Sequence, residues 1–151
     1  MTVVDSMHYA RPDQVHALED LQRRASRSLV GVPAVRDGEE DDIRISVAAV
    51  RDQRVRVAVG GGELLGFSTV APSLDRISRL EALYVDPVWA RQGVGGSLLD
   101  DAQAIAADEG IVRIEVLATV ESVGFFEWAG YARHRTEEVD CAAFVGLWRQ
   151  L

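Results

Sequence analysis

A glycine-rich turn between an apolar strand and a helix constrains this chain more than any other feature. The strand from Ile77 to Val85 ends at Asp86-Pro87, and glycines at 93, 95 and 96 then open a helix. Glycine removes the Cβ atom where a ligand must approach the backbone. The first turn of a helix leaves several N–H groups unpaired, and these groups favour phosphate together with the helix dipole. The segment from Arg91 to Ser97 therefore predicts an anion site that suits a diphosphate.

Two common phosphate-binding motifs do not fit this turn. The P-loop needs GxxxxGK followed by Ser or Thr, whereas every basic residue of this chain is arginine. The dinucleotide fingerprint needs G-x-G-x-x-G in the first strand–helix unit of a mostly parallel sheet. Here the glycines are spaced G-x-G-G and follow a predicted hairpin. Arg91 can add a bidentate contact to a phosphate, so the turn keeps its predicted character without either motif.

The hydrophobic periodicity predicts a single α+β domain over residues 1–151. A hairpin feeds the sheet, and the helix after the glycine turn connects two strands as a right-handed parallel crossover. In chain order we expect helices over 12–31 and 43–50, strands over 54–59, 64–70 and 77–85, a helix from 97 to 110, a strand over 111–117, a helix over 121–129, and strands over 131–139 and 142–148.

Charge and composition exclude several classes of protein. The chain has 24 acidic and 16 basic residues, a net charge of −8, and its arginines are scattered, so nucleic-acid binding is not expected. No apolar run reaches the roughly 20 residues that span a bilayer, and the first residues have no secretory pattern. One cysteine and three separated histidines give no metal-ligand spacing, so no metal is expected. A cytoplasmic protein is the expectation.

The run from Leu83 to Leu99 resembles the acetyl-CoA signature of the GCN5-related N-acetyltransferase (GNAT) family; it reads Leu-Tyr-Val-Asp-Pro-Val-Trp-Ala-Arg-Gln-Gly-Val-Gly-Gly-Ser-Leu-Leu. The order of elements from Val3 to the C-terminus also resembles this family. The resemblance implies a mixed, mostly antiparallel sheet of six to seven strands with about four helices. It further implies that strands 77–85 and 111–117 are parallel and splay apart, with the thioester of acetyl-CoA in the gap.

The resemblance also assigns contacts to the cofactor. The backbone of the strand before the turn would pair with the pantetheine arm, and the N–H groups of the turn would wrap the diphosphate. The expected cofactor-binding residues are Leu83, Tyr84, Val85, Arg91, Gln92, Gly93, Val94, Gly95, Gly96, Ser97, Thr119 and Phe126.

Three positions depart from the family pattern. Ala90 stands where Arg or Gln is usual, and Phe126 stands where a Tyr often protonates the departing thiolate. The family's frequent Asn falls on Thr119 or Val120, depending on whether it is counted from the helix or the strand. These departures leave an alternative open, in which the chain is a catalytically silent acyl-CoA-binding or regulatory module of the same fold.

Transfer of an acetyl group to an ammonium requires a general base. Glu81 is the first candidate, because it would share a face with Leu83 if the strand is regular, and Glu115 on the neighbouring strand is the second. Each could instead be a strand carboxylate paired with an arginine, for example Glu81 with Arg79 or Arg113. The N–H of Val85 would polarise the thioester carbonyl. Because Phe126 carries no proton, the thiolate would take one from Tyr84, water or the ammonium product.

The sequence constrains the acceptor less than it constrains the cofactor. By position it would enter between residues 28–42 and 135–140, and both segments are acidic through Glu39, Glu40, Asp41 and Asp42 and through Glu137, Glu138 and Asp140. We expect a primary amine, with a cationic one favoured, on a small molecule or a peptide. A homodimer and a longer acyl chain are left open. The three tryptophans at 89, 128 and 148 are expected to be packing residues.

Overall fold

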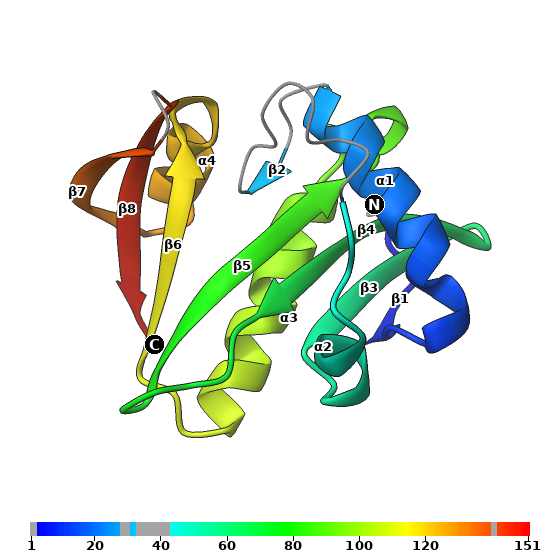
Figure 1. Cartoon of the computed structure of the whole chain (residues 1–151), viewed down its shortest axis with the longest axis horizontal. Helices are drawn as coiled ribbons and strands as arrows, with labels where there is room; N and C mark the ends of the chain where they lie inside the picture. Colours follow the sequence, from blue (N-terminus) through cyan, green and yellow to red (C-terminus); the bar gives the residue numbers. More distant parts are fainter. Residues whose placement is uncertain (1–2, 28–30, 33–42, 140–141) are drawn as a thin grey trace.

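One twisted sheet with helices on both faces forms the body of the molecule (Figure 1). The computed structural model describes residues 3–27, 31–32, 43–139 and 142–151. The strand order is β1-β3-β4-β5-β6-β8-β7, with β2 paired to β5 as a branch from this path. Among these pairings only β5 with β6 is parallel, which confirms the predicted mixed and mostly antiparallel α+β sheet.

The strands of the predicted hairpin and of the cofactor segment form close to their expected bounds. Their side chains alternate or are apolar throughout, as a sheet buried on one or both faces requires. The strands are β1 (Ser6–Tyr9), β2 (Gly31–Val32), β3 (Val55–Gly60), β4 (Glu63–Val70), β5 (Ile77–Val85), β6 (Arg113–Thr119), β7 (Ala132–Val139) and β8 (Ala142–Gln150). The four-residue β1 and the two-residue β2 were not predicted, because segments this short carry no usable period.

The helices cover the two faces of the sheet (Figure 1). In that view α1 and α2 lie in front of β3–β5, and α3 lies behind them. They are α1 (Val15–Arg27), α2 (Val47–Arg51), α3 (Val94–Asp108) and α4 (Val123–Trp128). Within the residues that the structure describes, no helix is long and apolar enough to cross a membrane.

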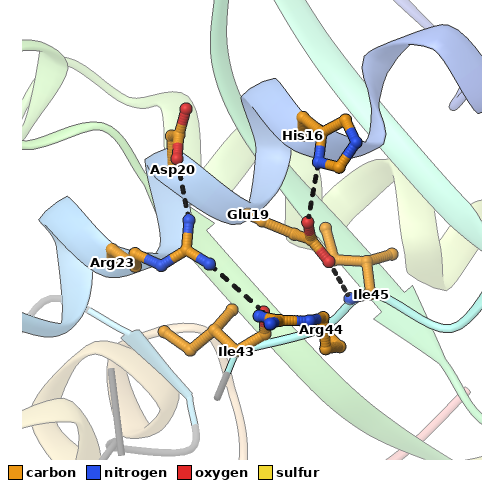
Figure 2. Close-up of polar contacts among 7 residues, drawn as sticks. All are labelled: His16, Glu19, Asp20, Arg23, Ile43, Arg44 and Ile45. Carbon is orange, nitrogen blue, oxygen red and sulfur yellow. Dashed lines mark hydrogen bonds and ion pairs between the residues drawn. The ribbon is translucent and has the colours of Figure 1, made fainter. Parts of the chain in front are cut away.

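The second helix is shorter than the sequence predicts. Ser46 is the N-cap of α2, and its Oγ accepts a hydrogen bond from the Ala49 N–H. The helix therefore begins only at Val47. The preceding residues are held by α1 instead (Figure 2). The buried carboxylate of Glu19 accepts a hydrogen bond from the Ile45 N–H at 2.8 Å, and Arg23 donates to the Ile43 carbonyl at 3.4 Å. These contacts compete with helix formation over residues 43–45.

Two apolar clusters fill the faces of the sheet. The cluster under α3 includes Leu98, Leu99 and Leu83, and the cluster under α1 includes Leu18, Leu21 and Phe67. An ion pair at one side joins the layers, because Arg56 on β3 donates two hydrogen bonds to Asp101 on α3, both at 2.9 Å. The sheet is therefore fixed between helices, and its interior strands are buried on both faces.

Gly66 on β4 leaves no room for a side chain between β5 and α3. A Cβ atom at this position would lie 2.6 Å from the Tyr84 carbonyl oxygen and 3.0 Å from Leu98 Cδ1. Gly66→Ala should therefore lower the free energy of unfolding by about 1–3 kcal/mol, measured by urea denaturation, because overpacking strains the core. Gly124→Ala on α4 is the matched control, since its Cβ would meet no heavy atom within 4 Å. Equal stabilities for the two variants would contradict this packing.

Candidate active site

The glycine turn adopts a backbone that exposes its amides. Arg91 has φ 62° and Gly93 has φ 85°, both in the left-handed region. Gly93 is the N-cap of α3, and no side chain caps this end of the helix. The hydrogen bonding of the helix starts at the Ser97 N–H, which donates to the Gly93 carbonyl at 3.0 Å. The amides before it are unpaired within the helix and form a concave donor set of the kind that binds anions.

The space around the turn is open on one side and packed on the other. A Cβ at Gly95 would lie 3.6 Å from Phe125 Cζ and 3.7 Å from Val85 Cγ2, so the turn sits between the end of β5 and α4. A Cβ at Gly96 would meet no heavy atom within 4 Å. The turn therefore has a firm apolar wall and an open side that can accept a ligand.

An ion pair with α1 holds the end of β5. The Asp86 carboxylate accepts from the Val88 N–H at 3.2 Å and from Arg24 Nη2 at 2.8 Å. Asp86 is almost fully buried, so this contact fixes where the strand stops and the turn begins. Sequence reasoning did not find Arg24, because it is 62 residues from Asp86 and no local pattern connects the two.

The parallel strands β5 and β6 separate beyond the middle of the sheet (Figure 1). Their paired residues run from Ile77↔Arg113 to Leu80↔Val116 and go no further. Beyond that point β6 remains paired with β8, and β5 with β4. The Asp86 N–H donates to the Leu65 carbonyl of β4, so by alternation the Val85 N–H points to the opposite edge, into the gap. The predicted splayed pair is confirmed.

The short strand β2 lies against this open edge. Gly31 is level with Tyr84 and Val32 with Leu83, in antiparallel pairing. The backbone of Leu83, which the resemblance assigned to the pantetheine arm, is thus paired with the chain itself in this structure. A ligand arm that uses the Leu83 backbone has to take the place of β2.

A bulge places Glu81 at the point where the strands separate. Thr69 pairs with Ala82 and Val70 with Leu80, so Glu81 is an extra residue on β5. Because the strand is not regular here, the expectation that Glu81 shares a face with Leu83 no longer follows. The carboxylate is 48% exposed, and its ion-pair partner is Arg54 at 4.0 Å, not the anticipated Arg79 or Arg113.

Glu115 lies within the paired part of β6, level with Arg79 on β5. Its carboxylate is 31% exposed and lies 3.4 Å from Arg113 Nη2. The structure therefore places the Glu81 backbone where β5 and β6 separate, with its carboxylate near Arg54, and places Glu115 within the paired region, engaged with an arginine of its own strand.

Tyr84 is buried on the face of the sheet that α1 covers, and its side chain is not part of the cluster under α3. It belongs to the cluster under α1, its ring lies 5.6 Å from that of Phe67, and its hydroxyl hydrogen bonds with Gln22. Burial raises the pKa of the Tyr84 phenol, so the group stays protonated. The predicted proton transfer from Tyr84 to the thiolate stays a prediction, and in this arrangement the side chain contributes to packing.

Thr119 and Phe126 lie at the far side of the gap. Thr119 is buried and its Oγ1 shares a hydrogen bond with Ser122 Oγ at 2.9 Å. Phe126 is fully buried and packs edge-on against Phe125 and Tyr131, at 5.1 Å and 5.4 Å between ring centroids. Sequence reasoning missed Ser122, a hydroxyl whose proximity to Thr119 results from the single turn at Val120–Ser122.

The acidic side chains expected to bind the acceptor lie outside the described part of the structure. Glu39, Glu40, Asp41, Asp42 and Asp140 lie outside the described residues, as do the side chains of Glu137 and Glu138. Within the described part of the chain, no three metal-ligating side chains gather at one place.

The comparison with solved structures finds the same fold in several acetyltransferases. A GCN5-related N-acetyltransferase from Rhodopseudomonas palustris superimposes with a TM-score of 0.79 at 18% identity, over 100% of this chain and 98% of its own. N-acetylglutamate synthase from Neisseria gonorrhoeae, complexed with coenzyme A and N-acetyl-glutamate, gives 0.76 at 18% identity, over 97% of this chain and 35% of its own. PaiA N-acetyltransferase from Thermoplasma acidophilum, in complex with coenzyme A, gives 0.70 at 15% identity, over 97% and 98%.

The comparison with curated protein sequences gives no match. A family model described as an acetyltransferase (GNAT) domain matches residues 39–143, which is more than half of the chain and contains the bulged strand, the glycine turn and α4. Fold, splayed strands and family match agree, and the chain belongs to the GNAT acetyltransferase domain family.

Proposed function

We propose that the protein is an N-acetyltransferase that moves an acetyl group from acetyl-CoA to a primary amine by direct transfer in a ternary complex. The observation that carries this proposal is the uncapped, glycine-lined start of α3 at the end of a strand that β6 leaves beyond Leu80 and that only the two-residue β2 then covers. Together they offer donors for a diphosphate and a backbone edge for an extended amide-containing arm. Membership of the acetyltransferase family supports the same reading.

The residues at this site fit acetyl-CoA. Amides of the turn from Arg91 to Ser97 would hold the diphosphate, and the free space at Gly96 admits it. The backbones of Leu83 and Val85 would hold the pantetheine arm after β2 has left the edge. When bound, acetyl-CoA supplies the activated acetyl group and a thiolate as leaving group. The Val85 N–H, directed into the gap, would stabilise the developing oxyanion.

Glu81 is the proposed general base, and Glu115 is the alternative. Glu81 follows the last residue of β5 that pairs with β6, so its backbone lies where the two strands separate, and its carboxylate is 48% exposed. A β-bulge re-aims a side chain relative to the strand, and bulges are frequent beside active sites. Glu115 is level with Arg79, within the closed part of the sheet. Direct attack requires only that base, amine and thioester are held in contact.

The proton for the thiolate is proposed to come from the ammonium product or from water. Phe126 has no acidic proton, and Tyr84 is buried in the cluster under α1. The paired hydroxyls of Thr119 and Ser122 lie at the end of β6 and could donate a hydrogen bond to the sulfur. A hydrogen bond of this kind would lower the barrier without a dedicated acid.

The acceptor is proposed to be a primary amine on a small molecule or a peptide, with a cationic amine favoured by the acidic segments at 39–42 and 137–140. Two proteins of similar fold carry names that specify amine acceptors of different size. One is the N-acetylglutamate synthase, and the other is a ribosomal-protein-S18-alanine N-acetyltransferase from Escherichia coli. The fold therefore accommodates both size classes.

A silent acyl-CoA-binding module is the second candidate, favoured by Phe126 and Ala90 at positions where the family usually has Tyr and Arg or Gln. Release of free CoA, followed with a thiol reagent across a panel of amines, separates the two. We expect release with polyamines or basic peptides and much less with neutral or acidic amino acids. Tight binding of acetyl-CoA without release with any amine would identify the module instead.

Gly96→Glu should weaken acetyl-CoA binding about tenfold or more, because a carboxylate in the first turn of α3 repels the diphosphate. The fold should be retained, since a negative charge suits a helix N-terminus and position 96 is open. Isothermal titration calorimetry gives the Kd, and Gly96→Gln is the matched neutral control, with a smaller loss. Equal affinities for both variants and the native protein would contradict a diphosphate site at this turn.

Glu81→Gln should lower kcat by about 10²- to 10⁴-fold and leave the Kd for acetyl-CoA unchanged, because it removes a proton acceptor without altering the cofactor contacts. Glu115→Gln is the control, because it makes the same carboxylate-to-amide change at the alternative base. A large loss in Glu115→Gln with none in Glu81→Gln would reassign the base to Glu115.

A further inference from the structure

Trp128 departs from the expectation that all three tryptophans are packing residues. Its side chain is 82% exposed at the end of α4. Trp89 packs against the cluster under α3, and Trp148 lies under the Arg113 guanidinium at 4.4 Å from its ring centroid. An indole is the largest apolar surface that a side chain can offer, so its exposure here calls for a physical explanation.

The helix geometry directs Trp128 away from the core. Val123 and Phe126 are the buried residues of α4, and Trp128 is rotated about 200° from Phe126 around the helix axis. The residue one turn before it on the same outer row is Gly124, which has no side chain and open space around it. One flank of the indole is therefore uncovered by its own helix.

Trp128 is also close to the glycine turn. Phe125 is the α4 residue whose ring is 3.6 Å from the Cβ position of Gly95. Residues three apart on a helix have Cβ atoms about 5–6 Å apart, so Trp128 is a neighbour of Phe125 on the surface of α4. The exposed residue is thus next to Phe125, whose ring forms the apolar rim of the proposed diphosphate site.

We propose that Trp128 stacks against the adenine ring of coenzyme A and is the adenine-binding residue of this protein. The inference rests on the proposed use of acetyl-CoA. In that molecule a single ribose separates the diphosphate from the adenine, so a diphosphate held at Gly95 and Gly96 places the base within reach of the rim. Every nucleobase offers a flat π face, and an indole with one open flank matches it. Glu127, the residue before Trp128, is held in an exposed ion pair with Arg133 at 3.0 Å.

Trp128→Ala should weaken acetyl-CoA binding about tenfold, within the range that stacked bases lose on alanine substitution, and leave kcat unchanged. It should not change the KM for an acetyl thioester of pantetheine, which lacks the adenosine. Trp128→Phe should retain most of the affinity because it keeps an aromatic face. Leu74→Ala is the control for loss of exposed apolar surface, since Leu74 is 76% exposed in the loop between β4 and β5.

Tryptophan fluorescence gives an independent readout. Adenosine 3′,5′-bisphosphate should quench the emission of the native protein, and Trp128→Phe should lose the quench while Trp89→Phe and Trp148→Phe keep it. Native affinity for acetyl-CoA in Trp128→Ala would overturn the inference and leave the proposed function standing. A native dimer that Trp128→Ala converts to a monomer would overturn it as well, because the ring would then belong to a protein interface. If the native protein does not bind acetyl-CoA at all, the proposed function fails first.

Discussion

The early end of the pairing between β5 and β6 is the constraint on which the rest of the site depends. Four residue pairs hold the two strands together; beyond them β6 keeps its pairing with β8, and β5 keeps its pairing with β4 and gains the short β2. Backbone N–H and C=O groups inside a protein need partners, so an open edge in the middle of a sheet is costly unless something extended lies along it. The bulge at Glu81 and the Arg24–Asp86 ion pair set where this edge begins and ends.

Either the backbone of β2 or the arm of the proposed ligand can pair with this edge of β5. In this structure β2 pairs with Leu83 and Tyr84, and the proposed ligand would use the same backbone groups through its amides. Exchange of one set of hydrogen bonds for another changes the free energy little, because each donor is satisfied before and after. The net affinity for the ligand must then come from contacts that β2 does not make. The amides of the α3 N-terminus would supply such contacts, so in the proposed complex the turn and not the strand edge would set how tightly acetyl-CoA is held.

The parts of this site that the sequence predicted are those encoded locally. The run Ile77–Val85 is apolar and ends at Asp-Pro, so both its bounds and its place before the glycine turn could be predicted. The bulge at Glu81 could not, because it is a property of the pairing with Thr69 and Val70 and not of the strand itself. The same holds for Arg24, whose partner is distant in sequence. Helical spacing over 43–50 was misleading, since contacts from α1 hold the first half of that segment extended.

An acidic chain that binds a polyanion needs a local source of positive potential. The net charge is −8, yet fixed charges more than about 10 Å away are largely screened at 0.1 M ionic strength. The field at the turn is therefore set by its own groups, the amides of α3 and the exposed Arg91. Ala90 lacks the Arg or Gln side chain that the family pattern usually has at that position, which shifts the balance toward backbone dipoles. Dipoles fixed by a helix need no reorganisation and release few counterions, so the proposed anion binding at this turn is expected to depend less on salt than binding through flexible arginines would.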